Sequence, residues 1–186
     1  MSNEGEVLRE HISDRYFESF FLDEGYILKE KNDERDYRIR IKAEDKNTNE
    51  IHVFKDIELL KNSKNSTYIY KNPPADCDYI LLDDRNRNII FIELKQYKKK
   101  GDISKTSLQE KMRASQKWLD HFFFCSHQEL KLSDWSSIYI CINHKTAGRY
   151  SKIDRKPFST YPVKIYYGEG DMFDFSTLTN PRYRMS

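Results

Sequence analysis

A run of four apolar residues, Ile89-Ile90-Phe91-Ile92, lies between Asn88 and Glu93. A second apolar stretch, from Ile80 to Asp83, precedes it, and the intervening Asp84-Arg85-Asn86-Arg87 has the polar composition of a turn. Together these segments predict a β-hairpin. A continuous apolar run is typical of a strand buried on both faces, whereas a half-exposed strand alternates apolar and polar residues. We therefore expect a layered fold in which the second strand of the hairpin is covered on both sides.

The register of this hairpin brings charged residues together at its open end. If the ladder closes around the four-residue turn, Asp83 faces Asn88, and counting outward places Asp78 opposite Glu93. Directly opposed residues of an antiparallel pair have Cβ atoms about 4.5 to 5.5 Å apart, which allows two carboxylates to share one hard cation. Lys95 follows Glu93 by two residues and is expected on the same face.

The alternative is a surface hairpin whose charges are solvated, which is the more common setting for an isolated Glu-x-Lys sequence. Here the strand that ends in Glu93 and Lys95 is otherwise apolar, and charges at its end are costly unless they are paired or metal-bound. Two carboxylates this close would also repel, and one would take up a proton unless a divalent cation joined them. The pattern favours a metal site over a solvated surface.

Composition limits the class of protein. The 186 residues suit one domain, residues 1–186, and the net charge of +2 means that any attraction for nucleic acid comes from local clusters. Three cysteines without a Cys-x-x-Cys pair support neither a disulfide framework nor a zinc ribbon, and the five histidines are scattered. We find no signal sequence and no long apolar span, so we expect a cytoplasmic protein without membrane contact.

The remaining periodicity predicts helices at both ends of a group of strands. Apolar spacing over Glu6 to Leu22 predicts an N-terminal helix that stops before Gly25, and the tail after Asp171 is expected to pack loosely. The basic face of the strand that begins at Tyr37 is expected to be solvated. The predicted order is helix, strands, long helix and two strands, which indicates an α/β layer structure with a mixed sheet. Besides the hairpin, the expected strands and long helix are 37–43, 67–70, 104–124, 135–142 and 163–167.

Pro74, the Asp76/Asp78 pair, the apolar hairpin, Glu93-Leu94-Lys95 and the long helix after them resemble the PD-(D/E)-x-K nuclease superfamily. The resemblance covers about residues 6–143 and implies a restriction-endonuclease-like fold, in which a mixed central β-sheet is flanked by an N-terminal helix and a long helix after the Glu-x-Lys strand. It also implies hydrolysis of phosphodiester bonds with Mg²⁺ or Mn²⁺.

The resemblance assigns roles residue by residue. Asp78 corresponds to the motif aspartate, Glu93 to the second acid and Lys95 to the lysine, with the metal held by Asp78, Glu93 and the carbonyl of Leu94. Asp76 competes for the first position, since Pro74 stands two residues before it and the literal Pro-Asp form is absent. By the hairpin register Asp76 would lie opposite Lys95, as its ion-pair partner, so the choice between the two aspartates stays open.

Further residues are candidates for supporting roles. Many members of the superfamily add a glutamate from the first helix, for which Glu10 and Glu18 are available, and some add a glutamine from the later helix, for which we consider Gln116. For each of them an exposed helix position is the alternative. The basic residues near the proposed centre are candidates for phosphate contacts: Lys98, Lys99, Lys100, and on the helix Lys105, Lys111, Arg113 and Lys117.

The resemblance implies a nuclease, most of all a DNA endonuclease, and a role in bacterial antiviral defence is common in this fold. One alternative is a junction-resolving nuclease that acts as a homodimer. Another is a non-catalytic nucleic-acid-binding or assembly subunit with the same fold, which the intact set of Asp78, Glu93 and Lys95 argues against. No motif for sequence-specific DNA reading is present, so a protein partner or a second copy is expected to supply targeting.

Overall fold

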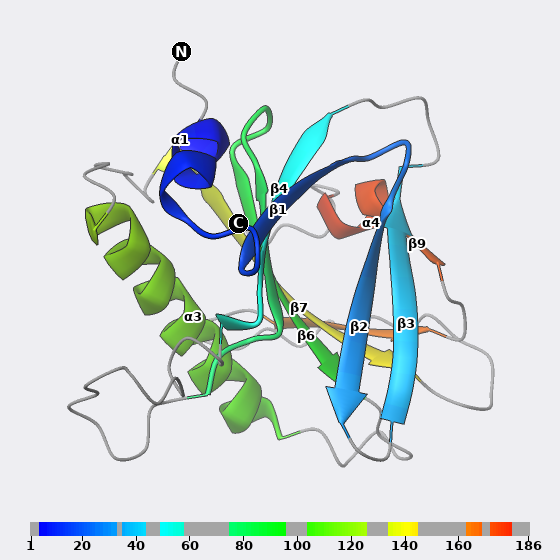
Figure 1. Cartoon of the computed structure of the whole chain (residues 1–186). Coiled ribbons are helices and arrows are strands. Elements are labelled where there is room, and N and C mark those ends of the chain that lie inside the picture. Colours follow the sequence, from blue (N-terminus) through cyan, green and yellow to red (C-terminus); the bar gives the residue numbers. More distant parts are fainter. Residues whose placement is uncertain are drawn as a thin grey trace.

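A mixed six-stranded sheet forms the centre of the molecule (Figure 1). The computed structural model describes residues 4–32, 35–43, 49–57, 75–95, 104–125, 134–144, 163–168 and 172–179. The order of the strands is β1-β4-β5-β6-β7-β8, antiparallel from β1 to β6 and parallel from β6 to β8. The predicted α/β class with a mixed sheet is confirmed. The strands are β1 (Phe17–Phe21), β4 (Glu50–Lys55), β5 (Tyr79–Asp83), β6 (Asn88–Lys95), β7 (Ser136–His144) and β8 (Val163–Gly168).

The central hairpin has the predicted register. Asp83 pairs with Asn88, and the ladder runs outward to Tyr79 and Ile92. The turn is closed by the buried Asp83 carboxylate, which accepts hydrogen bonds from the backbone N–H and the side-chain amide of Asn86 at 3.2 and 2.8 Å. Arg87, the last turn residue, has φ of 51°, in the left-handed region that such tight connections require.

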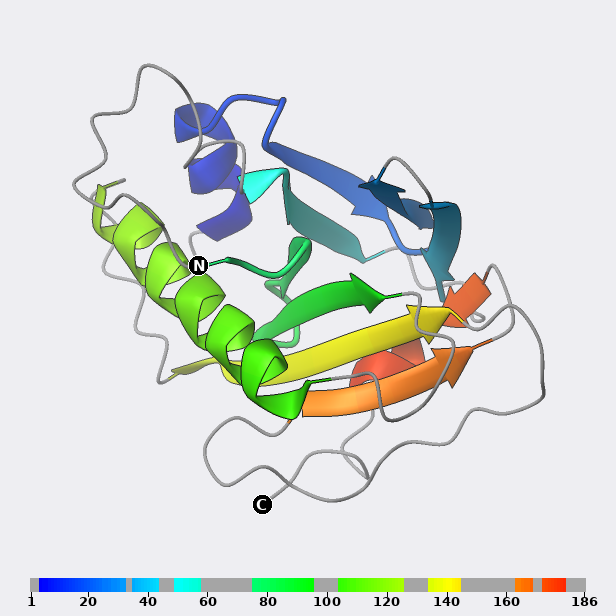
Figure 2. The same ribbon diagram turned by 90° about the horizontal axis from the view of Figure 1, so that it is seen from below.

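The long helix α3 (Lys105–Cys125) connects β6 to the parallel strand β7, as a parallel pair requires of its crossover. It lies against one face of the six-stranded sheet (Figure 2). Its buried residues Leu108, Met112, Leu119 and Phe123 follow helical spacing and join the apolar side chains of that face. The predicted helix over 104–124 is confirmed within one residue at each end.

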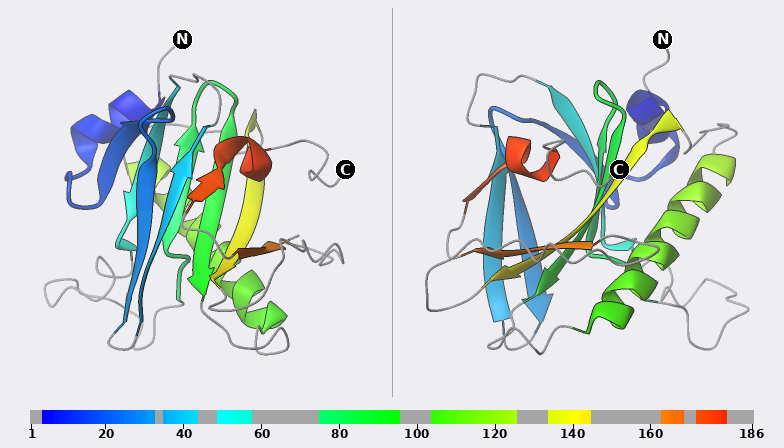
Figure 3. Two further views of the ribbon diagram at one scale, coloured as in Figure 1. Left: turned by 90° about the vertical axis from the view of Figure 1, so that its right-hand side faces the viewer. Right: turned by 180° about the vertical axis from the view of Figure 1, so that it is seen from behind.

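A second sheet covers the opposite face, so the molecule has three layers (Figure 3). It consists of β2 (Tyr26–Asn32), β3 (Arg35–Lys42) and β9 (Met172–Asp174), and the last strand runs parallel to β3. β3 includes most of the predicted strand 37–43, with Ile39 and Ile41 buried.

For residues 172–179 the expectation of a loosely packed tail after Asp171 is wrong, and the remainder of that tail lies outside the described residues. β9 pairs with β3, and the short helix α4 (Phe175–Thr179) buries Phe175 and Leu178 between the two sheets. The reason is tertiary: three strand residues and five helix residues are too few for a periodic signal, and their stability comes from the pairing and the apolar contacts they make.

The N-terminal helix is shorter than predicted. α1 (Glu4–His11) ends well before Leu22, and the residues from Phe17 onward form β1, which pairs with β4. The closely spaced aromatic residues fit helical periodicity as well as a strand with both faces covered. Phe17 and Phe20 in fact lie on opposite faces of the sheet. Pairing within the sheet therefore determines that this segment is a strand and not a helix. Gly25 does not stop a helix but makes the turn before β2, with φ of 78°. The possible strand 67–70 lies outside the described residues.

Candidate metal centre

Glu93 is a charged residue inside the sheet, near the end of β6. Its side chain is 0% exposed, and the neighbouring strand residue in β7 is the buried Cys141. Oε1 of Glu93 forms ion pairs with two lysines, whereas no hydrogen-bond donor in the described part of the chain reaches Oε2. A buried carboxylate oxygen without a donor is rare, because leaving it unpaired costs about 1 to 3 kcal/mol or more. Oε2 is therefore the atom of this site that most needs a ligand.

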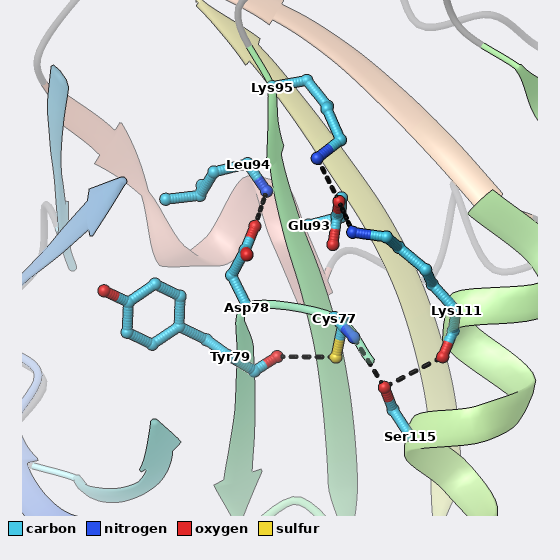
Figure 4. Close-up of polar contacts among 8 residues, drawn as sticks. All are labelled: Cys77, Asp78, Tyr79, Glu93, Leu94, Lys95, Lys111 and Ser115. Carbon is cyan, nitrogen blue, oxygen red and sulfur yellow. Dashed lines mark hydrogen bonds and ion pairs between the residues drawn. The ribbon is translucent and has the colours of Figure 1, made fainter. Parts of the chain in front are cut away.

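The two lysines come from different elements. Lys95 lies two residues after Glu93 on β6 and contacts Oε1, as the strand alternation predicts. Lys111 reaches the same oxygen from the first half of α3, with an Nζ–Oε1 distance of 2.5 Å (Figure 4). Both side chains are about one-fifth exposed. Solvent therefore reaches part of each lysine side chain, although Glu93 itself is fully buried.

Asp78 lies one residue beyond the last pair of the ladder, where the predicted register places it across from Glu93. Its Oδ2 accepts the backbone N–H of Leu94 at 2.6 Å, so the side chain takes the place of the next ladder acceptor (Figure 4). Burial, and after it the negative charge of Glu93, raises the pKa of Asp78 to about 7. The Leu94 hydrogen bond and the two lysines oppose this shift. The negative charges of Asp78 and Glu93 therefore repel each other, as the predicted register implies.

Ser115 connects the segment before Asp78 to the helix that carries Lys111. The backbone N–H of Cys77 donates to Ser115 Oγ at 2.8 Å, and the Ser115 hydroxyl donates to the carbonyl of Lys111 at 2.9 Å. Ser115 is 0% exposed. The bonds form a chain from one acid-bearing segment to the helix (Figure 4). The Cys77–Ser115 bond ties the segment before Asp78 to α3, and the Ser115–Lys111 bond lies within the helix.

The oxygen atoms of this site suit a hard cation as ligands. In a β-strand the N–H and C=O of one residue point to the same side, so the carbonyl of Leu94 is directed toward Asp78. Two carboxylates and a carbonyl are oxygen ligands of the kind that Mg²⁺ and Mn²⁺ prefer. Burial raises the pKa of the thiols of Cys77 and Cys141, which argues against thiolate ligands for a softer metal. Among the described residues, no three His, Cys, Asp or Glu side chains gather as a metal-binding group. Bound waters or a phosphate would thus have to complete the coordination.

The other predicted residues lie at varying distances from this centre. Asp76 is buried two residues before Asp78, and Glu10 is exposed on α1. Glu18 lies on β1 and not on a helix, and its carboxylate pairs with Lys55 at 2.6 Å. Gln116 accepts a hydrogen bond from the hydroxyl of Tyr139 at 3.1 Å. Lys98, Lys99 and Lys100 lie outside the described residues.

Sequence reasoning did not assign Lys111 and Ser115 to the acid pair. Lys111 was a candidate for phosphate contact only. A signal was present, since Leu108, Lys111, Met112 and Ser115 follow the spacing i, i+3, i+4 and i+7 of the sheet-facing side of the helix. A lysine inside an apolar stripe requires a partner, and the acids at the open end of the hairpin were available as partners.

Comparison of the chain with models of protein families, with curated proteins and with solved structures finds no significant match. The α/β architecture and the geometry of the acid pair therefore carry the functional argument. No helix in the described ranges is long and apolar enough to cross a membrane.

Proposed function

We propose that this chain is a Mg²⁺-dependent nuclease that hydrolyses phosphodiester bonds, with Mn²⁺ able to replace Mg²⁺. Glu93 is the observation that carries the proposal: a fully buried acid with one oxygen held by Lys95 and Lys111 and the other without a donor in the described residues. A purely structural ion pair would gain from satisfying both oxygens. An acid that must bind an incoming cation has a reason to leave one open.

Each residue of the centre has a distinct role in this proposal. Asp78, Glu93 and the carbonyl of Leu94 would hold the cation. A divalent cation in such a site polarises the phosphate and lowers the pKa of bound water. Lys95, beside Glu93, supplies a fixed positive charge that stabilises the additional negative charge on the phosphate during attack. The Leu94 N–H orients Asp78 by holding Oδ2.

DNA is the substrate we favour, and an endonuclease in bacterial antiviral defence is the role we favour; both rest on the resemblance to the PD-(D/E)-x-K superfamily. A homodimer or a protein partner would supply targeting. The restriction-endonuclease-like fold itself belongs to this proposal. The mixed sheet, the central hairpin and the helix after the Glu-x-Lys strand support it.

A non-catalytic subunit with the same fold is the second candidate. It is favoured by the balance of charge at Glu93, because two ammonium groups already neutralise the site without any cation. In that case the cluster would be structural. The two candidates differ in whether the protein binds divalent metal and cuts nucleic acid.

The test is cleavage of plasmid and linear DNA with Mg²⁺, with Mn²⁺ and with EDTA. We expect cutting with either cation, none with EDTA, and a loss of about a hundredfold or more in Glu93→Gln and in Lys95→Met, the size typical of removing a group that stabilises transition-state charge. Glu110→Gln, at an exposed acid of α3, is the matched control and should retain activity. Equal cutting by all variants would show that the activity arises elsewhere, and no cutting together with no metal binding would support the non-catalytic subunit.

A further inference from the structure

Four charged groups interact at the centre, and their formal charges cancel. Asp78 and Glu93 contribute two negative charges, and Lys95 and Lys111 contribute two positive ones. The pKa of Asp78 responds to each of the other three, so the four groups form one electrostatic unit. A divalent cation added to this unit would bring two uncompensated positive charges into a largely buried region, where the cost of excess charge is high.

The two ammonium groups are not equivalent. Lys95 is two residues from Glu93 on the same strand, whereas Lys111 approaches from a different element, across the layer between sheet and helix (Figure 4). The backbone of Lys111 is held in place by the helix and by the Ser115 hydroxyl. Its ammonium group is at the end of a four-carbon side chain that is about one-fifth exposed. It can therefore leave Glu93 and turn toward solvent without any movement of the helix.

A phosphate that approaches the exposed part of the Lys111 side chain would offer this ammonium group a second anion. When Lys111 moves from Glu93 to a phosphate, the negative charge of Glu93 is no longer compensated by Lys111 and can attract the cation, and the phosphate compensates part of the added positive charge. Cation and phosphate would thus each favour the binding of the other, and such coupling is reciprocal by thermodynamic necessity.

We propose that Lys111 couples metal binding to nucleic-acid binding at this centre: its ammonium group neutralises Glu93 in the free protein and transfers to a phosphate when nucleic acid arrives. This inference rests on the proposed nuclease function. Lys111 is then a positioning residue that acts through Glu93. The metal-free protein binds Mg²⁺ weakly, and the complete metal site forms only with the substrate present.

The test measures Mn²⁺ affinity by isothermal titration calorimetry on the full chain, without nucleic acid and with a saturating short DNA duplex whose phosphorothioate linkages keep the charge and resist cleavage. In the wild type we expect the duplex to tighten Mn²⁺ binding by about tenfold, a typical coupling between two sites. Lys111→Met should bind Mn²⁺ about tenfold more tightly than the wild type without DNA, because one positive charge is removed beside the ligand. Adding DNA should tighten Mn²⁺ binding to Lys111→Met by a smaller factor than it does for the wild type, because only the part of the coupling that depends on Lys111 is lost.

Two variants serve as controls. Lys111→Arg keeps the charge and should retain the wild-type Mn²⁺ affinity in the absence of DNA. Lys29→Met removes an exposed lysine from β2, outside the centre, and should match the wild type in both conditions. Thermal melting of each variant establishes that it is folded.

The outcomes separate this inference from the proposed function. If the wild type binds Mn²⁺ but Lys111→Met binds it equally or less tightly without DNA, Lys111 only supports the structure and the coupling is refuted, while the nuclease proposal stands. If the wild type binds no Mn²⁺ under either condition, the metal-dependent function fails and the coupling fails with it.

Discussion

The hydroxyl of Tyr79 makes two hydrogen bonds to the backbone of a single residue, Lys29. It accepts the N–H of Lys29 at 2.9 Å and donates to the carbonyl of Lys29 at 2.8 Å. Tyr79 follows Asp78 directly, and its side chain points to the opposite face of the sheet from Glu93 (Figure 4). The second sheet is therefore held in place by the residue next to the proposed metal ligand.

Tyr79→Phe should destabilise the protein, because it leaves both backbone groups of Lys29 without their side-chain partner. We expect a loss of about 1 to 3 kcal/mol in the free energy of unfolding, measured by urea denaturation. Tyr139→Phe, which removes the hydrogen bond to the side chain of Gln116 and leaves backbone groups paired, is the comparison and should cost less. A loss for Tyr79→Phe no larger than that for Tyr139→Phe would mean that water replaces both bonds at Lys29.

Ser115→Ala should weaken the link between the acid-bearing segment and α3. The N–H of Cys77 is buried and donates to Ser115. The variant leaves this N–H without an acceptor, which should lower the free energy of unfolding by about 1 to 3 kcal/mol. The same variant should accelerate hydrogen exchange of the Cys77 amide, which reports the bond directly. Ser107→Ala, at an exposed position of the same helix, is the control. Unchanged exchange at Cys77 would contradict the link.

The sequence was sufficient for the central hairpin because its information is local. Four polar residues fix the turn, the turn fixes the register, and the register places Asp78 across from Glu93. The same two-residue period predicts that Lys95 shares the face of Glu93, and the two side chains are in contact. Local rules of this kind require no knowledge of the rest of the fold.

The rest of the centre depends on contacts between distant segments. Lys111 meets Glu93 only because α3 crosses back over the sheet at one particular angle, which no sequence period specifies. For the same reason Phe17 and Phe20 were interpreted as one face of a helix, although pairing with β4 makes them part of a strand. At the edge of the sheet, the secondary structure of a segment therefore depends on which strand is available to pair with it.

Mg²⁺ or Mn²⁺ should raise the melting temperature of the wild type, because a ligand that binds only the folded state stabilises it. The gain is about 2.7 kcal/mol when the free cation exceeds its dissociation constant about a hundredfold. Glu93→Gln should abolish this gain, as it removes the charge from the oxygen without a donor in the described residues. Differential scanning calorimetry with and without EDTA provides the measurement. Glu110→Gln, which removes an exposed acid, should keep the full metal effect; equal metal effects in Glu93→Gln and the wild type would exclude Glu93 as a ligand.

The raised pKa of Asp78 predicts an unusual dependence of stability on pH in the metal-free protein. An ordinary aspartate has a pKa of 3.8, and burial next to Glu93 raises the pKa of Asp78 to about 7. Between these values the folded state binds more protons at Asp78 than the unfolded state. The contribution of Asp78 to the free energy of unfolding therefore falls as the pH rises from about 4 to 7 and is constant above this range. Its total size is at most about 4 kcal/mol, since one pKa unit corresponds to about 1.4 kcal/mol.

Asp78→Asn isolates this contribution, because the amide does not titrate. The wild type in EDTA should lose stability relative to Asp78→Asn as the pH rises from 4 to 7, measured by urea denaturation at each pH. Asp14→Asn, at an exposed carboxylate, controls for the removal of an acid from the surface. Saturating Mg²⁺ should reverse the trend in the wild type, since the cation binds the ionised form of Asp78 and so favours folding at the higher pH. A constant difference between wild type and Asp78→Asn would place Asp78 in a solvated environment. A difference that grows in favour of the wild type as the metal-free protein passes from pH 4 to 7 would mean that the lysines and the Leu94 N–H lower the pKa of Asp78, and either result would contradict the raised pKa.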